Sequence, residues 1–376
     1  MKWLTAPALA IAALMAPVAA QATPAATRLV TDCPLRDAPF TLDSPLYDVL
    51  LSPAAKAAVE RVRPGFVAGI PPFFASSEVP SFATILSFKT MVRFNPATTQ
   101  AELDQLAAAL RTVPVTAADR VARCARYDND RPNLTVTPGR PGQPRVLIFE
   151  KMTGFRDGPS VEAARAAFVG IAQREGFAYA VTEQGGAINP RTLRQFDVIV
   201  WNNVSGDVLT LSQRRVLKNW VEHGGSFVAV HGSAGDPTYF WDWYVDSLIG
   251  ARFTGHPSDP QFQDATVRIE QTASGIGAGL PASFTMNDEW YSFVASPRPH
   301  VNVIATLDES TYRQAGRFGT NITMGADHPI VWDHCVGRGR SFYSAIGHRP
   351  EQYAEPRYVT MLTQAITWAA RRGGTC

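Results

Sequence analysis

The sequence lacks the features that mark several common classes of protein. It has only four cysteines in 376 residues and no CxxC pair, which argues against a zinc site built from thiolates. Its net charge is +2, with lysines and arginines dispersed along the chain, so we expect no nucleic-acid partner. Beyond the N-terminal segment, no apolar run approaches the ~20 residues that span a bilayer. With these classes disfavoured, we expect a soluble protein that acts on small molecules.

The first 22 residues have the three parts of a secretory signal peptide. Lys2 supplies the positive start, an apolar run extends from Ala6 to Ala20, and an A-x-A pattern ends at Ala22. The run is shorter than a membrane span, which favours cleavage after Ala22 over retention as an anchor. We therefore expect residues 1–22 to be a signal peptide, and the mature protein to be periplasmic or secreted without a membrane anchor.

Residues 28–127 have the pattern of a small helical module. Apolar residues recur at three- and four-residue steps over 46–59, and further helices are predicted at 82–94 and 100–112. Residues 128–143 are rich in proline and glycine, which predicts a stiff, exposed linker. Because every candidate for chemistry follows this linker, we expect the helical module to be dispensable for chemistry.

Residues 144–371 alternate between apolar strands and amphipathic helices. This alternation predicts an α/β domain with a doubly wound, mostly parallel sheet that is covered on both faces. Thr210 and Gln213 form a capping box at the start of one helix. Strands are expected at 145–149, 178–181, 197–201, 226–230, 266–269, 301–306, 330–335 and 340–345, and helices at 160–175, 210–223 and 357–371.

The four cysteines are expected to form disulfides, because an exported chain meets an oxidising compartment. Four cysteines allow three pairings. Grouping them by domain favours Cys33 with Cys124, and Cys335 with Cys376. The alternative is free buried thiols, which pack as small apolar side chains.

Ligands of a doubly wound sheet bind beyond the carboxyl ends of its strands. This rule selects residues 150–157, Asn202-Asn203, and the turn that begins at His231. The last place has the form of a nucleophile elbow, but a histidine stands there, and Ser233 lacks the G-x-S-x-G frame. A hydrolase with a serine or cysteine nucleophile is therefore disfavoured.

Five motifs follow one another in the second domain, at 221–231, 248–257, 287–291, 327–332 and 337–348. Together they resemble the ThuA (trehalose utilisation) family over residues 144–371. The resemblance implies a fold like that of class I glutamine amidotransferases without their cysteine nucleophile, with His231 at that elbow. It also implies a role in the uptake and oxidation of trehalose and related disaccharides, often through 3-keto sugars.

Histidines and acidic residues in these motifs are the candidates for chemistry. Histidine is a common metal ligand and titrates near neutral pH, and a mixed nitrogen and oxygen set suits zinc or another divalent ion. Acid/base work without a metal and a purely structural role are the alternatives. We expect His231, Asp288, Glu289 and His348 to be catalytic, and His231, His256 and His348 to be the ligands of any divalent metal. His328 is the weakest candidate, because it starts a strand.

Aromatic residues crowd the same motifs. Flat rings stack on sugar faces, and an indole N–H or phenol O–H donates to hydroxyls, although most aromatic residues belong to the core. The residues expected to bind substrate are Asn202, His256, Trp290, Tyr291 and Trp332.

The sequence thus predicts an enzyme, a hydrolase, lyase or isomerase, that acts on a small sugar or an oxidised 3-keto glycoside. It is not predicted to be a cysteine-dependent amidotransferase. The alternative is a noncatalytic carbohydrate-binding protein. A homo-oligomer is compatible with either reading.

Overall fold

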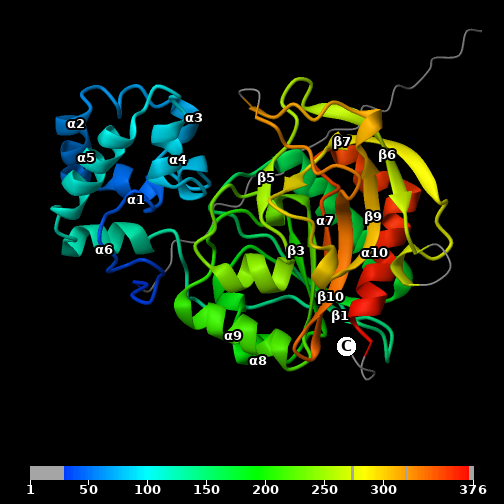
Figure 1. Cartoon of the computed structure of the whole chain (residues 1–376). Helices are drawn as coiled ribbons and strands as arrows, with labels where there is room; N and C mark the ends of the chain where they lie inside the picture. Colours follow the sequence, from blue (N-terminus) through cyan, green and yellow to red (C-terminus); the bar gives the residue numbers. More distant parts are fainter. Residues whose placement is uncertain (1–28, 272–274, 318–319, 372–376) are drawn as a thin grey trace, which may run out of the picture.

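The computed structural model describes residues 29–271, 275–317 and 320–371, which form a helical lobe and a larger lobe built on a sheet (Figure 1). The expected signal peptide, residues 1–22, lies outside the described residues. Within the described part, no helix is long and apolar enough to cross a membrane.

The helical lobe is made of short helices, because prolines and serines interrupt the apolar pattern. Pro53 begins a new helix after Leu51, and Ser87 caps another through the backbone N–H of Thr90. The single helix predicted at 82–94 is therefore wrong, and the helix at 117–124 was not predicted. The elements are α1 (Leu46–Leu51), α2 (Pro53–Val62), α3 (Pro72–Ala75), the 3₁₀ turn η1 (Phe82–Thr84), α4 (Phe88–Arg93), α5 (Gln100–Arg111) and α6 (Ala117–Cys124).

A disulfide joins Cys33 to Cys124, as predicted. Both cysteines are buried with Val30 and Tyr127, so the bond closes the helical lobe on itself. Cys335 is also disulfide-bonded, and its expected partner Cys376 lies outside the described residues.

The larger lobe contains a nine-stranded sheet in the order β2-β1-β3-β4-β11-β10-β9-β6-β7. Neighbours from β2 to β11 are parallel, and those from β11 to β7 are antiparallel. The strands are β1 (Arg145–Phe149), β2 (Ala178–Thr182), β3 (Val198–Asn202), β4 (Ser226–Val230), β6 (Phe262–Ile269), β7 (Ser283–Glu289), β9 (Asn302–Asp308), β10 (Pro329–Val336) and β11 (Gly339–Ser344), while β5 (Phe253–Gly255) and β8 (Ser292–Phe293) form a separate pair.

Helices cover both faces of this sheet, so the predicted α/β class is confirmed. Helices α7 (Gly158–Glu175) and α10 (Pro356–Ala369) contact each other, and α9 (Leu211–Glu222) and α8 (Pro190–Leu193) lie across the sheet from α10 (Figure 1). The capping box predicted for Thr210 and Gln213 is present at the start of α9. Strands β3 and β4 are buried along their whole length, as parallel strands between two helical layers should be.

No strand was predicted from the sequence at Asp288 and Glu289, and that prediction is wrong. They end strand β7, where Asp288 pairs with Gln263 and Glu289 pairs with Phe262. The apolar residues Phe284 and Met286 alternate with polar neighbours, and in the structure they alternate as buried and exposed positions. This alternation is typical of a strand and could have predicted β7.

The segment between the lobes, residues 128–143, is largely exposed but is attached to the larger lobe. Asp128 accepts hydrogen bonds from the backbone N–H groups of Gly185 and Gly186, and Thr137 pairs with Tyr179 of β2. The bonds of Asp128 hold the start of the linker beyond the carboxyl end of β2, and the pairing of Thr137 holds the middle of the linker beside the amino end of that strand.

Candidate functional site

Three polar side chains from distant parts of the chain converge at the carboxyl edge of the sheet. His231 follows β4, Glu289 ends β7, and His348 lies in the loop after β11; these three strands all point the same way. His231 Nε2 lies 3.1 Å from His348 Nδ1 and 3.4 Å from Glu289 Oε2. His348 Nδ1 lies 2.9 Å from the same carboxylate oxygen. We call these three residues the His–Glu–His cluster.

The backbone at His231 has the sharp turn that its place after a strand predicts. Its φ angle is +34°, in the region that non-glycine residues rarely occupy. Its Nδ1 donates to the carbonyl oxygen of Ala345 at 2.8 Å, and the ring of Tyr291 packs on it at 4.3 Å between centroids. These contacts fix the imidazole so that Nε2 faces Glu289 and His348.

Glu289 is the centre of the cluster, with a carboxylate that is almost fully buried. One oxygen faces His231 and His348, and the other lies 3.2 Å from His256 Nδ1 and accepts from Gln261 Nε2. Burial raises the pKa of Glu289, but hydrogen bonds from His231 and His348 outweigh it and hold the pKa well below its usual value. Glu289 is therefore a carboxylate anion at neutral pH.

Asp288 lies behind the cluster and shapes the loop that carries His348. Its carboxylate accepts from three backbone N–H groups, those of Gly347 at 2.7 Å, Glu289 at 2.9 Å and Arg349 at 3.0 Å. Burial raises its pKa in spite of these bonds. The structure thus places Asp288 as a positioning residue for His348, whereas the sequence suggested a catalytic role.

His348 has a second acidic neighbour that the sequence did not single out. Its Nε2 lies 3.9 Å from the carboxylate of Asp157, and its carbonyl oxygen accepts from Ser160 at the start of α7. Burial lowers the pKa of His348, but its hydrogen bond to Glu289 outweighs burial, so the pKa is raised. Asp157 is the last of residues 150–157, which the strand-end rule selected, but it was not among the expected site residues.

The donor atoms of the cluster lie close enough together to be the ligands of one divalent ion. An ion bound at about 2.1 Å by each ligand sets the ligand atoms roughly 3.0 to 3.4 Å apart at octahedral and tetrahedral angles. The observed separations are 2.9, 3.1 and 3.4 Å. The other nitrogen of His231 donates to a backbone carbonyl, as the free nitrogen of a metal-bound histidine commonly does.

The expected ligand set is therefore altered in one member. Among the residues that the structure describes, His231, Glu289 and His348 form the group whose ligand atoms all lie within 4.8 Å of one another, so Glu289 joins the candidate set and His256 lies beside it. His256 directs Nδ1 at Pro257 O, at 2.8 Å, and at Glu289. Its side chain is 34% exposed, which leaves it accessible beside the cluster.

The residues expected to bind substrate divide into two groups. Tyr291 and His256 border the cluster. Asn202, Trp290 and Trp332 are buried, and their polar groups donate within the protein, to Glu150 and Val161, to Gln263 O and to Ile249 O respectively. A buried N–H group that already donates within the protein belongs to the core. The sequence pattern does not show in which direction such a group points.

His328 supports Tyr291 and lies outside the cluster. It is fully buried, its Nε2 donates to Tyr291 O at 2.8 Å, and its Nδ1 lies 2.8 Å from a carboxylate oxygen of Glu309. Because Tyr291 packs on His231, this pair stabilises the wall of the site.

The sequence did not identify the rings that face His348. Phe262 and Phe155 lie 5.1 and 6.2 Å from its imidazole, between ring centroids. Phe155 is held by Ser205, whose Oγ accepts from its backbone N–H. The sequence predicted a strand at 266–269, but β6 begins four residues earlier, at Phe262, so Phe262 was not considered.

A buried acid contacts the loop after β3 that carries Ser205. Asp236 accepts from Ser205 Oγ at 2.6 Å and from Gly206 N at 2.7 Å. Burial raises the pKa of Asp236 from 3.8 to about 7. Folding therefore favours the protonated acid.

We expect this acid to make stability depend on pH. Because the pKa of Asp236 is raised in the folded state, its contribution to the free energy of unfolding is complete below about pH 4. That contribution, about 4 kcal/mol at most, is lost as pH rises through 7. Asp236→Asn should reduce the fall in unfolding free energy between pH 4 and pH 8, measured by urea titration. Asp104→Asn, on the exposed side of α5, is the control. Equal pH profiles for wild type and Asp236→Asn would contradict this assignment.

Comparison with known proteins agrees with the motifs and the fold. The ThuA family model, described as trehalose utilisation, matches residues 145–369. A ThuA-like protein of known structure from Bacteroides uniformis is 25% identical over 61% of this chain and 93% of its own, with a TM-score of 0.51. Another from Parabacteroides merdae is 15% identical over 61% of this chain and 90% of its own, with a TM-score of 0.46. No curated protein matches the chain. Because the family model spans more than half of the sequence, this chain belongs to the ThuA family.

Proposed function

We propose that this protein is a periplasmic or secreted enzyme that acts on a small sugar or an oxidised 3-keto glycoside through metal-assisted chemistry at the His–Glu–His cluster. Family membership implies a role in carbohydrate metabolism. The observation that carries the chemistry is the buried carboxylate of Glu289, which faces the imidazoles of His231 and His348. The Cys33–Cys124 disulfide supports a location outside the cytoplasm.

The donor set suits zinc or another divalent ion held by His231 Nε2, Glu289 Oε2 and His348 Nδ1. When bound, such an ion polarises a carbonyl, such as that of a 3-keto sugar, or lowers the pKa of a water molecule. Three protein ligands leave coordination positions for substrate or water. Asp157 would then orient the imidazole of His348 from the side opposite Glu289.

His256 is the residue best placed to move a proton. Its Nδ1 faces Pro257 O and Glu289, so the other ring nitrogen, Nε2, lies on the side of the ring opposite Glu289. A partly exposed imidazole next to a buried carboxylate has the access and the neighbour that general acid/base catalysis uses. We assign His256 as the general acid or base.

An enzyme and a noncatalytic sugar-binding protein differ in what Glu289→Gln does. We expect wild-type protein to convert a 3-keto disaccharide, made by oxidation of trehalose, and the variant to lose this activity, as followed by ¹³C NMR. The amide keeps the shape of the side chain but removes its charge. Glu351→Gln, at a glutamate whose side chain is 66% exposed in the 3₁₀ helix Pro350–Ala354, is the matched control.

A wild-type protein that binds the sugar without forming product, together with unchanged affinity in Glu289→Gln, would establish the noncatalytic alternative instead. Affinity is measured by isothermal titration on the same samples.

A further inference from the structure

A hollow of about 1070 Å³ lies at the amino edge of the sheet, opposite the edge that carries the His–Glu–His cluster. It is lined by Phe196 and Asp197 just before β3, by Ser226 at the start of β4, and by the turn that leads into β11. Because β3, β4 and β11 are parallel, their first residues meet at this one edge. The volume is at the upper end of the range for small-molecule sites, roughly 1,000 Å³.

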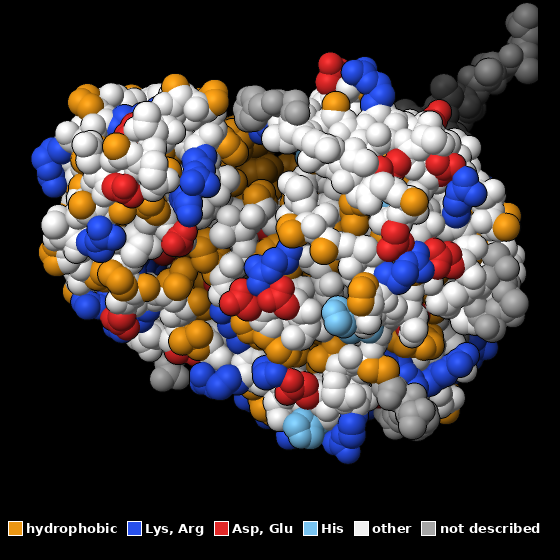
Figure 2. Space-filling model, viewed as in Figure 1, with side chains coloured by type: hydrophobic (Ala, Val, Ile, Leu, Met, Phe, Trp, Pro, Cys, Tyr) orange, Lys and Arg blue, Asp and Glu red, His pale blue; other side chains and the backbone are white. Residues whose placement is uncertain are grey.

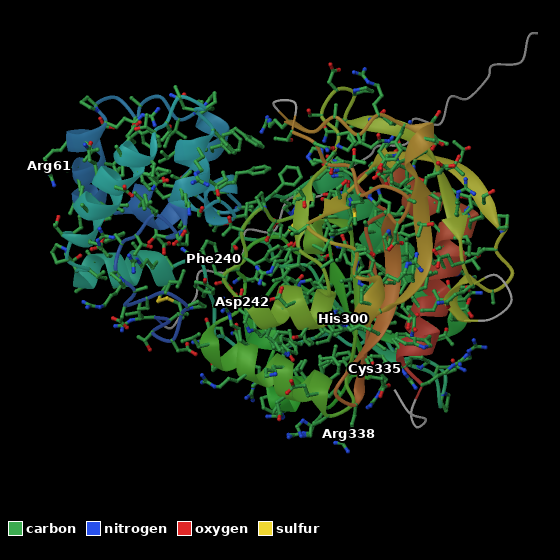
Figure 3. The ribbon with its side chains drawn as sticks, viewed as in Figure 1. Arg61, Phe240, Asp242, His300, Cys335 and Arg338 are labelled. Atoms are coloured by element: carbon green, nitrogen blue, oxygen red, sulfur yellow. A yellow bond between two sulfur atoms is a disulfide. The ribbon has the colours of Figure 1, made fainter. Side chains whose placement is uncertain are left out.

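Positive side chains dominate the lining of this hollow. Guanidiniums come from the ends of α8 and α10, from α9, and from β11 and the turn before it: Arg194, Arg215, Arg338, Arg340 and Arg371. Asp197, the one acid in the described lining, forms an ion pair with Arg145 at 3.0 Å. Figure 2 shows Lys and Arg side chains along the lower edge of the larger lobe, where Figure 3 labels Arg338. Positive charge is therefore in excess in the hollow.

Two of these arginines serve the ends of the neighbouring helices. Arg340 Nη1 donates to Trp368 O at 3.1 Å, at the end of α10, and Arg338 Nη2 donates to His223 O at 3.5 Å, at the end of α9. A helix end carries a partial charge of about −0.5, so the two ends together offset about one positive charge. The guanidiniums that remain are not balanced by the fold.

The other three arginines have side chains that are available to a ligand. Arg194, Arg215 and Arg371 are exposed. Within the ranges that the structure describes, their guanidiniums have no hydrogen-bond or ion-pair partner. Their N–H groups are therefore free to donate to an anion.

Helix α9 presents one face to the hollow. Its lining residues recur at three- and four-residue steps, as the residues of one helical face do: Ser212, Arg215, Val216, Asn219, Trp220 and His223. Arg215 and Asn219, four residues apart, place a guanidinium and a carboxamide next to each other on this face. Helix α8, which ends beside Arg194, is in contact with α9. Donors from two adjacent helices thus line one hollow.

We propose that this hollow binds a small molecule through a phosphate or sulfate group. The planar fork of a guanidinium matches the oxygens of such a group, which it binds through two parallel hydrogen bonds. The apolar side chains of Leu193, Val216 and Trp220 in the same lining contact the rest of the molecule. A concave hollow suits a small molecule better than the surface of a membrane, whose headgroups carry the same phosphate. This site is independent of the function proposed for the cluster, because the two lie at opposite edges of the sheet.

Isothermal titration of the full chain with inorganic phosphate and with sulfate tests this inference. The buffer contains about 0.15 M NaCl, at which exposed charges are screened beyond about 8 Å. We expect wild type to bind both anions with a Kd below about 1 mM. Arg194→Gln/Arg215→Gln should bind them at least about 10-fold more weakly, because each substitution removes a charged donor.

Arg61→Gln/Arg93→Gln is the matched control, since it removes the same charge from exposed arginines of α2 and α4 in the helical lobe. It should leave both affinities unchanged, and thermal melts check that both double variants are folded. Sedimentation with phosphatidylglycerol vesicles distinguishes a lipid headgroup from a small molecule. We expect the wild-type protein to stay in the supernatant.

The inference is overturned if wild type shows no saturable binding of either anion below about 10 mM. It is also overturned if Arg194→Gln/Arg215→Gln binds as wild type does, or if the two double variants lose affinity equally. Binding to the vesicles without binding of the free anions would replace the small-molecule site by a membrane-facing surface.

Discussion

His231→Ala is expected to abolish binding of a divalent ion at the proposed metal site and to lower the proposed turnover by about a thousandfold or more, with the fold retained. The substitution removes one of three ligand atoms, and residues that act as a unit show losses of this size when one is removed. The imidazole lies at a strand end, and its loss leaves Ala345 O without that donor, at a cost of roughly 1 to 3 kcal/mol. Alanine is no better suited to the φ of +34°, so the backbone strain remains.

Metal content by mass spectrometry and initial rates on the same preparation measure both effects. Wild type should hold about one divalent ion per chain, as a single three-ligand site predicts. His300→Ala, at an exposed histidine labelled in Figure 3, is the matched control and should keep both metal and rate. Retention of a stoichiometric ion by His231→Ala would show that the cluster is not the metal site.

Removing the Cys33–Cys124 disulfide should cost about 4 to 5 kcal/mol of unfolding free energy. The two cysteines are 91 residues apart, and a loop of that length restricts the unfolded chain by about this amount in the chain-entropy description. The bond also holds the N-terminal segment, where Asp32 accepts from the backbone N–H and hydroxyl of Ser212 in α9.

Urea unfolding of the Cys33→Ser/Cys124→Ser double variant, followed by circular dichroism, measures this loss. Ser76→Ala, in the loop between α3 and η1 of the same lobe, is a control of similar size and should change little. A change below ~1 kcal/mol would mean that packing of Val30 and Tyr127 closes the lobe without the disulfide.

Several parts of the fold were predicted correctly because local patterns encode them. Strand β1 and strand β4 were predicted at their observed bounds, since each is a short apolar run between turn residues. The capping box of Thr210 and Gln213 was read from two residues three positions apart. Where the pattern was interrupted, as at Pro53 and Ser87, the predicted helices were too long.

The candidate site was predicted in part. The strand-end rule placed His231 at the carboxyl edge, and the family motifs led to Glu289 and His348, which the structure brings within hydrogen-bond distance of one another. The same reasoning selected Trp290 and Trp332, whose indoles are fully buried. Residue type alone does not distinguish a ring that faces a ligand from a ring in the core.

The amino-acid sequence by itself predicted strands β1 to β4, helices α7 and α9, and the edge of the sheet where polar residues gather. These properties depend on periodicity, on turn residues and on the chain direction of parallel strands, which are local. Only the tertiary structure decided that Glu289 lies between His231 and His348, that Asp288 accepts from the backbone of the His348 loop, and that Phe82 of the helical lobe packs on Phe155 beside His348. Those contacts join residues that are at least 59 positions apart in the sequence. They depend on side-chain direction and close packing, which a local sequence pattern does not specify.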